Sequence, residues 1–99
     1  MSSAVISVTE REFDRQVRDF AKMTGWMTYH TWLPIHSPAG FPDLCLVRRD
    51  RIVFAELKSA KGKTTPKQDE WLEALRATGK VEVYLWRPDD LQAICELLR

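Results

Sequence analysis

Three stretches of the chain place apolar residues at the three- and four-residue spacing of an amphipathic helix. The first begins at Thr9, where a glutamate three residues later completes a capping box, and it ends at Gly25. The second begins at Thr65, has proline in its first helical position, and ends at Gly79. The third opens at Pro88. The pattern therefore predicts three helices separated by non-helical segments.

Shorter apolar stretches between these helices predict four strands. They cover residues 26–32, 43–47, 51–58 and 81–86 and are rich in β-branched and aromatic residues. The second and third are apolar on both faces, which is typical of central strands covered by helices on both sides. The resulting order, α-β-β-β-α-β-α, predicts an α/β fold with a mixed sheet flanked by helices. A chain of 99 residues has room for one domain, which we expect to span residues 1–99.

Membrane and zinc-binding classes are not indicated. No apolar run approaches the roughly 20 residues that cross a bilayer, and residues 1–9 lack the basic and apolar regions of a secretory signal. The two cysteines, Cys45 and Cys95, have no paired ligand spacing. We therefore expect a cytoplasmic protein with no membrane partner.

Basic residues gather in one part of a nearly neutral chain. The net charge is +1, yet the segment from Arg48 to Lys67 holds seven basic and two acidic residues. Such a local basic surface suits a phosphate-backbone partner, and a solvated loop would give the same pattern. Within this segment Lys61, Lys63 and Lys67 directly follow the third strand, and we predict that they contact DNA.

The hairpin of the second and third strands brings three ionisable residues together. If its turn is the pair Arg49-Asp50, Asp43 lies opposite Glu56, and opposite residues of an antiparallel pair project to the same face. Lys58 follows Glu56 by two residues and shares that face. A loop with an odd number of residues would move Asp43 away from Glu56. The even turn predicts two carboxylates and an ammonium group at one end of the hairpin.

Two adjacent carboxylates repel each other unless a cation joins them. Their hard oxygen atoms suit Mg²⁺ or Mn²⁺, which would acidify a water molecule and polarise a phosphate. Lys58 could orient that water or offset developing charge. The alternative is purely structural, with Asp43 ending a turn and Glu56 pairing with Lys58 at a strand end.

The motifs resemble those of a known nuclease family. Gly40-Phe41-Pro42-Asp43 followed by Glu56-Leu57-Lys58 resembles the PD-(D/E)xK signature of the restriction-endonuclease-like superfamily. Within it, the chain is similar to the VRR-NUC (virus-type replication-repair nuclease) domain, especially stand-alone versions from bacteriophages. The resemblance covers almost the whole chain and includes Glu10, Gln68 and the strand at residues 81–86.

The resemblance implies roles for individual residues. Metal ligands would be Asp43, Glu56 and the backbone carbonyl of Leu57, and Lys58 would be catalytic. Gln68 resembles the family's helical glutamine, which lies near the site, although a capping role at the start of the second helix is compatible with that.

A glutamate of the first helix would complete the site, through a water molecule or a second metal. Glu10 and Glu12 are both available. We favour Glu10, because it lies three and seven residues before Phe13 and Val17 and should point inward with them, whereas Glu12 already serves the capping box.

The sequence thus predicts an endonuclease that hydrolyses DNA with Mg²⁺ or Mn²⁺. We expect a homodimer acting on branched or four-way-junction DNA in replication, recombination or repair, in the cytoplasm of a bacterial host. Trp32, Leu33 and Ile35 are apolar candidates for the dimer interface. The alternative is a DNA-binding module that keeps the fold without cleaving.

Overall fold

The predicted order of helices and strands is confirmed in the computed structural model, which describes residues 8–32 and 36–99. Residues 33–35, and with them the interface candidates Leu33 and Ile35, lie outside the described part. The elements are α1 (Glu10–Met23), β1 (Met27–His30), β2 (Leu44–Arg48), β3 (Arg51–Leu57), α2 (Pro66–Ala77), β4 (Glu82–Trp86), the 3₁₀ turn η1 (Pro88–Asp90) and α3 (Leu91–Leu98). Both predicted capping boxes form, at Thr9 in α1 and at Thr65 in α2.

The four strands form one mixed sheet in the order β1-β2-β3-β4. The pairs β1–β2 and β2–β3 are antiparallel, whereas β3 and β4 are parallel. In the β2–β3 hairpin Leu44 lies opposite Ala55 and Arg48 opposite Arg51. The turn is therefore the two residues Arg49 and Asp50, as the sequence predicts, and Arg49 adopts a φ of 56°.

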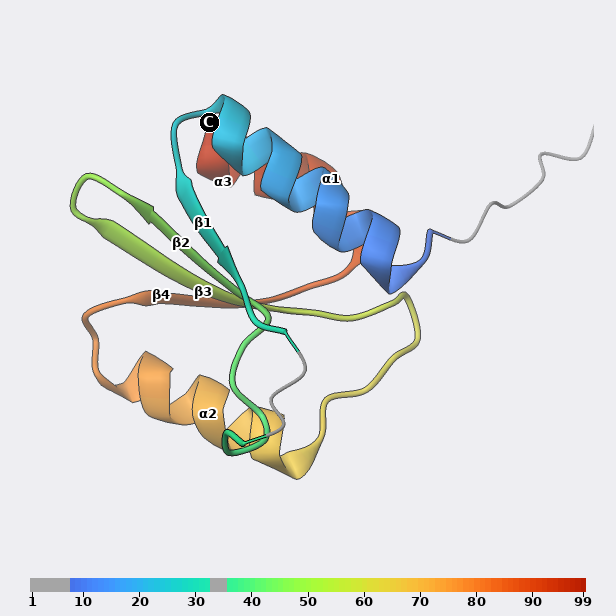
Figure 1. Ribbon diagram of the computed structural model, residues 1–99, viewed down its shortest axis with the longest axis vertical. Coiled ribbons are helices and arrows are strands. Elements are labelled where there is room, and N and C mark those ends of the chain that lie inside the picture. The colour runs from blue at the N-terminus through green and yellow to red at the C-terminus, as the bar shows by residue number, and fades with distance from the viewer. Residues whose placement is uncertain (1–7, 33–35) are drawn as a thin grey trace, which may run out of the picture.

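One side of the sheet, which we call the closed face, packs against α1 and α3 (Figure 1). Its side chains from the sheet, together with those of the two helices, form the hydrophobic core: Phe13, Val17, Ala21, Leu44, Leu46, Val53, Ala55, Leu57, Ile94 and Leu98. Trp26 closes one corner of this core. Its indole Nε1 donates to the Leu98 carbonyl at 2.8 Å, and the guanidinium groups of Arg48 and Arg51 lie 4.5 and 4.9 Å from its ring centre.

The other side of the sheet, which we call the open face, carries Tyr29, Asp43, Phe54 and Glu56. Helix α2 lies on this side (Figure 1) and contacts mainly β4. Toward β1, Met27 and Tyr29 are 76% and 64% exposed. The expectation that helices cover both faces of the central strands is therefore only partly met, because α2 shields one half of the open face. In the described part of the chain, no helix combines the length and apolar character needed to span a membrane.

Candidate active site

The confirmed hairpin register brings Asp43 and Glu56 together on the open face. Asp43 directly precedes β2, and Glu56 is the residue of β3 that continues the pairing beyond Leu44 and Ala55. Lys58 follows β3, and its Nζ lies 3.4 Å from Glu56 Oε2. The three residues that the sequence singled out therefore form one cluster.

Glu56 is the most unusual group in this cluster. Its side chain is 1% exposed, and within the described part of the chain its Oε1 has no hydrogen-bond partner. Burial, the charge of Asp43 and the hydrogen bond to Asp43 raise the pKa of Glu56 to about 8, and Lys58 only partly opposes them. Without a further cation, two carboxylates in contact share a proton or repel each other.

Backbone contacts hold Asp43 in position. The Leu57 N–H donates to Asp43 Oδ2 at 2.8 Å. Thr31, just after β1, donates its N–H to the Asp43 carbonyl at 2.8 Å and its hydroxyl to the Pro42 carbonyl at 2.9 Å. Thr31 is thus a positioning residue that sequence reasoning missed, since a threonine near a strand end has no distinguishing local pattern.

Gly40 joins the loop before Asp43 to the first turn of α2. Its φ is +100°, and a Cβ placed on it would lie 2.6 Å from the backbone carbon and oxygen of Lys67. Both the backbone conformation and the close approach require glycine here. This contact fixes the distance between Asp43 and α2, which carries Gln68.

Gln68 has two roles that do not conflict. Its side-chain oxygen accepts from the Thr65 N–H at 2.9 Å in the capping box. It also lines, with Asp43, a groove on the open face. This placement is consistent with the expectation that Gln68 lies near the site.

The carboxylates of α1 differ from the expectation. Glu12 serves the capping box, and hydrogen bonds from Thr9 lower its pKa. Glu10 is exposed, so the inference that it points inward with the apolar stripe is wrong. The buried carboxylate is Asp14, which lies 3.1 Å from Arg18 Nε and 3.1 Å from His30 Nδ1. The first turn of the helix lies beyond the core, and burial begins only at its second turn.

Two arginines of the basic segment make structural contacts within the protein. Arg48 donates to the Thr24 and Leu98 carbonyls, and Arg51 forms a bidentate ion pair with Glu82 at 2.7 and 2.8 Å. Arg48 and Arg51 therefore serve the fold, and the net charge of the segment overstates its basic surface.

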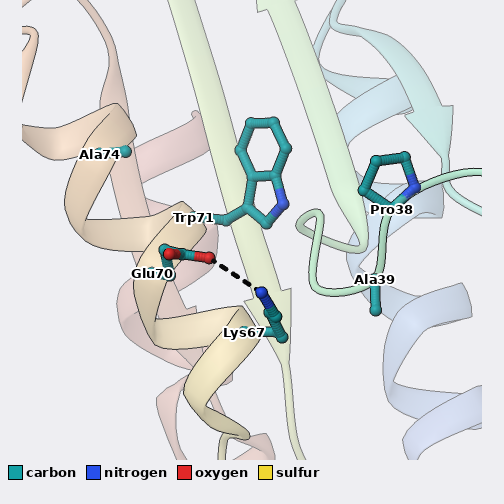
Figure 2. Close-up of a pocket in the computed structure, with 6 residues that line it drawn as sticks. All are labelled: Pro38, Ala39, Lys67, Glu70, Trp71 and Ala74. Carbon is teal, nitrogen blue, oxygen red and sulfur yellow. Dashed lines mark ion pairs between the residues drawn. The ribbon is translucent and has the colours of Figure 1, made fainter.

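The lysines after β3 remain at the surface. Lys61 and Lys63 are exposed on a loop that Arg87 holds through the Ser59 and Gly62 carbonyls, at 2.7 and 2.6 Å. Lys67 pairs with Glu70 at 3.6 Å on α2, as Figure 2 shows.

The donor atoms of the cluster fit a hard divalent cation. Among residues 8–32 and 36–99, no three Asp, Glu, His or Cys side chains form a group that could hold a metal. Magnesium commonly takes only one or two carboxylates from a protein, together with water and substrate phosphates. Asp43 and the unpartnered Oε1 of Glu56 meet that requirement.

Comparisons with known proteins agree with this fold. Two solved structures, titled "VRR_NUC domain protein" and "VRR_NUC domain", have TM-scores of 0.70 and 0.71 and identities of 20% and 21%. They cover 92% and 88% of this chain, and 88% and 94% of theirs. The Holliday junction resolvase Hjc of Archaeoglobus fulgidus has a TM-score of 0.57 and 18% identity, over 77% of this chain and 66% of that one.

At these identities the solved structures show a shared fold. No curated protein matches the chain. The sequence model of the VRR-NUC domain matches residues 8–87, most of the chain. The resemblance to the VRR-NUC domain is thereby confirmed, and the chain belongs to the VRR-NUC family.

Proposed function

We propose that the protein is a Mg²⁺- or Mn²⁺-dependent endonuclease that hydrolyses phosphodiester bonds in DNA. The observation that carries the proposal is the contact between the half-buried carboxylate of Asp43 and the buried carboxylate of Glu56, for which Lys58 is the one cationic partner in the described structure. Membership of the VRR-NUC family supports a nuclease, and Asp43 is accessible from the groove on the open face.

Each residue of the cluster has a distinct task. Asp43, Glu56 and the carbonyl of Leu57 would hold the metal, which supplies an acidified water and a polarised phosphate when bound. The Leu57 N–H keeps Asp43 oriented. Lys58, whose side chain is 14% exposed, would orient the attacking water or offset the negative charge of the transition state.

A plasmid-nicking assay tests this proposal. We expect cleavage with Mg²⁺ or Mn²⁺, none in EDTA, and binding without turnover in Ca²⁺, whose looser coordination holds the water less well. Glu70→Gln is a matched control, because Glu70 is an exposed carboxylate on α2. Binding of DNA without cleavage in any metal would instead favour the non-catalytic DNA-binding module.

We further propose a homodimer that acts on branched or four-way-junction DNA. Met27, Val47 and Ile52 lie side by side across the open face, at the end opposite to Asp43. Met27 and Ile52 are 76% and 40% exposed, and a second copy would cover them. A two-fold dimer presents two cleavage sites, which suits the symmetry of a four-way junction. The fold shared with a protein titled a Holliday junction resolvase supports this substrate.

Light scattering and junction cleavage test the dimer. We expect twice the 11.5 kDa chain mass, and paired nicks on opposite strands of a four-way junction. Ile52→Lys should give a monomer that nicks single strands. A wild-type monomer that trims linear ends would contradict the proposal. The proposed setting is DNA replication, recombination or repair in the bacterial cytoplasm, as the resemblance to stand-alone bacteriophage domains implies.

A further inference from the structure

An aromatic groove of 870 Å³ lies on the open face beside the candidate active site. Its walls include Tyr29, Trp32, Phe41 and Trp71, and Asp43 and Gln68 stand at one side. The groove is therefore continuous with the carboxylate that we assign to the metal. Its volume lies within the range of pockets that hold nucleotide-sized ligands.

Two of these aromatic rings form a fixed wall. Phe41 contacts Trp71 edge to face at a ring distance of 5.0 Å, and contacts Phe54 of β3 in the same manner at 5.7 Å. The Trp71 side chain projects from α2, and its ring lies between this helix and the loop that carries Pro38, as Figure 2 shows. Because Gly40 packs on the backbone of Lys67, this loop and α2 are joined beneath the ring. The wall is thus built by the same contacts that position Asp43.

The opposite wall is exposed to solvent. Tyr29 on β1 is 64% exposed, and Trp32 just beyond β1 is 76% exposed. Exposed apolar side chains that gather in one patch commonly mark a ligand-binding groove or an interaction site. Among the described residues that line the groove, Asp43 is the one that carries charge. The groove therefore suits a flat, uncharged group and offers nothing that would bind a phosphate without the metal.

We propose that this groove binds the base of an unpaired nucleotide next to the phosphate that is cleaved. This inference rests on the proposed nuclease function and specifies its substrate class: branched DNA in which the nucleotide at the cleavage position is unpaired or separates from its partner at the branch point. A base has two π faces, and it can stack on Tyr29 or Trp32 whatever its identity. A base paired within a duplex must first be unpaired and unstacked to enter the groove, which costs free energy that an unpaired base does not pay.

The test compares two DNA substrates that each contain one 2-aminopurine nucleotide. The nucleotide is unpaired in the first substrate and paired within a duplex in the second. Binding is measured in Ca²⁺, where cleavage is not expected, and 2-aminopurine fluorescence reports stacking. We expect wild-type protein to quench the fluorescence. Tyr29→Ala and Trp32→Ala should each weaken binding of the unpaired substrate on the order of 10-fold and leave duplex binding unchanged. Trp32→Phe should retain most of the effect. Met23→Ala, at an equally exposed apolar residue outside the groove, should change neither.

Three results would overturn the proposal. The first is equal loss of binding to both substrates, which would mean that the aromatic residues act on the fold. The second is no quenching by the wild-type protein. The third is conversion of a dimer to a monomer by Trp32→Ala without selective loss of the unpaired substrate, which would assign the groove to a second copy of the chain. Binding and fluorescence are measured without turnover. A protein that binds the unpaired substrate selectively but never cleaves would therefore refute the nuclease function and still support base binding in the groove.

Discussion

The two faces of the sheet use charged and aromatic residues in opposite ways. On the closed face, Trp26 is buried, donates to the Leu98 carbonyl and is flanked by Arg48 and Arg51, which have partners of their own. On the open face, Glu56 is equally buried but leaves Oε1 without a partner in the described structure, and Tyr29 and Trp32 remain exposed.

This difference separates the residues that stabilise the fold from those that await a ligand. Buried polar groups in folded proteins are nearly always hydrogen-bonded, so an exception needs an explanation. On the closed face Arg51 pairs with Glu82 and Asp14 with Arg18, and His30 Nδ1, which makes no hydrogen bond in the described structure, lies 3.1 Å from the Asp14 carboxylate. On the open face the unpartnered atom is a carboxylate oxygen, Oε1 of Glu56, beside a second carboxylate, Asp43. A metal ion and DNA would supply the missing partners there.

The largest effect should come from the carboxylates and the lysine of the open face. Asp43→Ala, Glu56→Ala and Lys58→Ala should each reduce cleavage by at least about 10²-fold, because metal and transition-state stabilisation act as one unit. Circular dichroism should show an intact fold for all three. Near wild-type nicking by the Glu56 variant would contradict the assignment of the active site to the open face.

Aromatic residues of the two faces should differ in their effect on stability. Trp26→Ala removes a 3% exposed indole and its hydrogen bond, so it should lower the free energy of unfolding by about 3–5 kcal/mol. Tyr29→Ala, at a 64% exposed residue, should change it by less than about 0.5 kcal/mol. Urea denaturation measures both. Equal losses would show that Tyr29 belongs to the core.

The junction between the loop and α2 can be tested with two glycines. Gly40 and Gly79 both have positive φ, but a Cβ on Gly40 would meet the Lys67 backbone at 2.6 Å, whereas a Cβ on Gly79 meets nothing within 4 Å among the described residues. Gly79→Ala should cost about 1–2 kcal/mol of stability through its positive φ alone, and Gly40→Ala should cost more because its Cβ also meets the Lys67 backbone. Only Gly40→Ala should also lower kcat, because it displaces Asp43 from α2. Equal activity of the two variants would contradict this positioning role.

The raised pKa of Glu56 should appear in the stability of the metal-free protein. The folded chain holds this proton up to a pKa of about 8, against an ordinary 4.5, so its contribution to stability is lost as pH rises across that range. Glu56→Gln removes the effect. We expect the variant to gain on the order of 3 kcal/mol over wild type between about pH 5 and about pH 8, which appears as a growing difference in Tm.

Thermal melts in EDTA at the two pH values measure this difference. Glu70→Gln, at an exposed carboxylate, should show no such gain. A constant difference between Glu56→Gln and wild type across the pH range would mean that Glu56 is ionised in the folded chain as readily as in water.

The smallest effect should come from the exposed lysines. Lys61→Glu and Lys63→Glu should weaken DNA binding about equally for all sequences, and each should reduce the salt slope by roughly 1. Lys22→Glu, an exposed charge on α1, should leave the slope unchanged. Binding titrations at several salt concentrations distinguish these cases. An unchanged slope for Lys61→Glu would mean that this loop is merely solvated.

Local patterns in the sequence predicted the fold and the central pair of the site. Capping boxes and the two-residue turn are encoded by adjacent residues, so Thr9, Thr65 and the pairing of Leu44 with Ala55 followed directly. The hairpin register then placed Asp43 beside Glu56 without any long-range information.

The features that were missed depend on contacts between distant segments. The sequence assigns Arg48 and Arg51 to the basic surface, yet both pack on the ring of Trp26. The indole of Trp26 is held in turn by its hydrogen bond to Leu98 of α3. The orientation of Glu10 depends on where the core ends beneath α1. The groove combines β1, the Gly40 loop and α2, which no spacing along the chain relates.

The central claim is that the open face holds a divalent metal between Asp43 and Glu56. Electron paramagnetic resonance of Mn²⁺ titrated into the protein tests it most directly, with nicking measured on the same samples. We expect wild-type protein to bind Mn²⁺ and to cleave, and Glu56→Gln to bind at least about 10-fold more weakly and to lose cleavage. Equal Mn²⁺ binding by the two proteins, or full cleavage by wild type in EDTA, would contradict the claim.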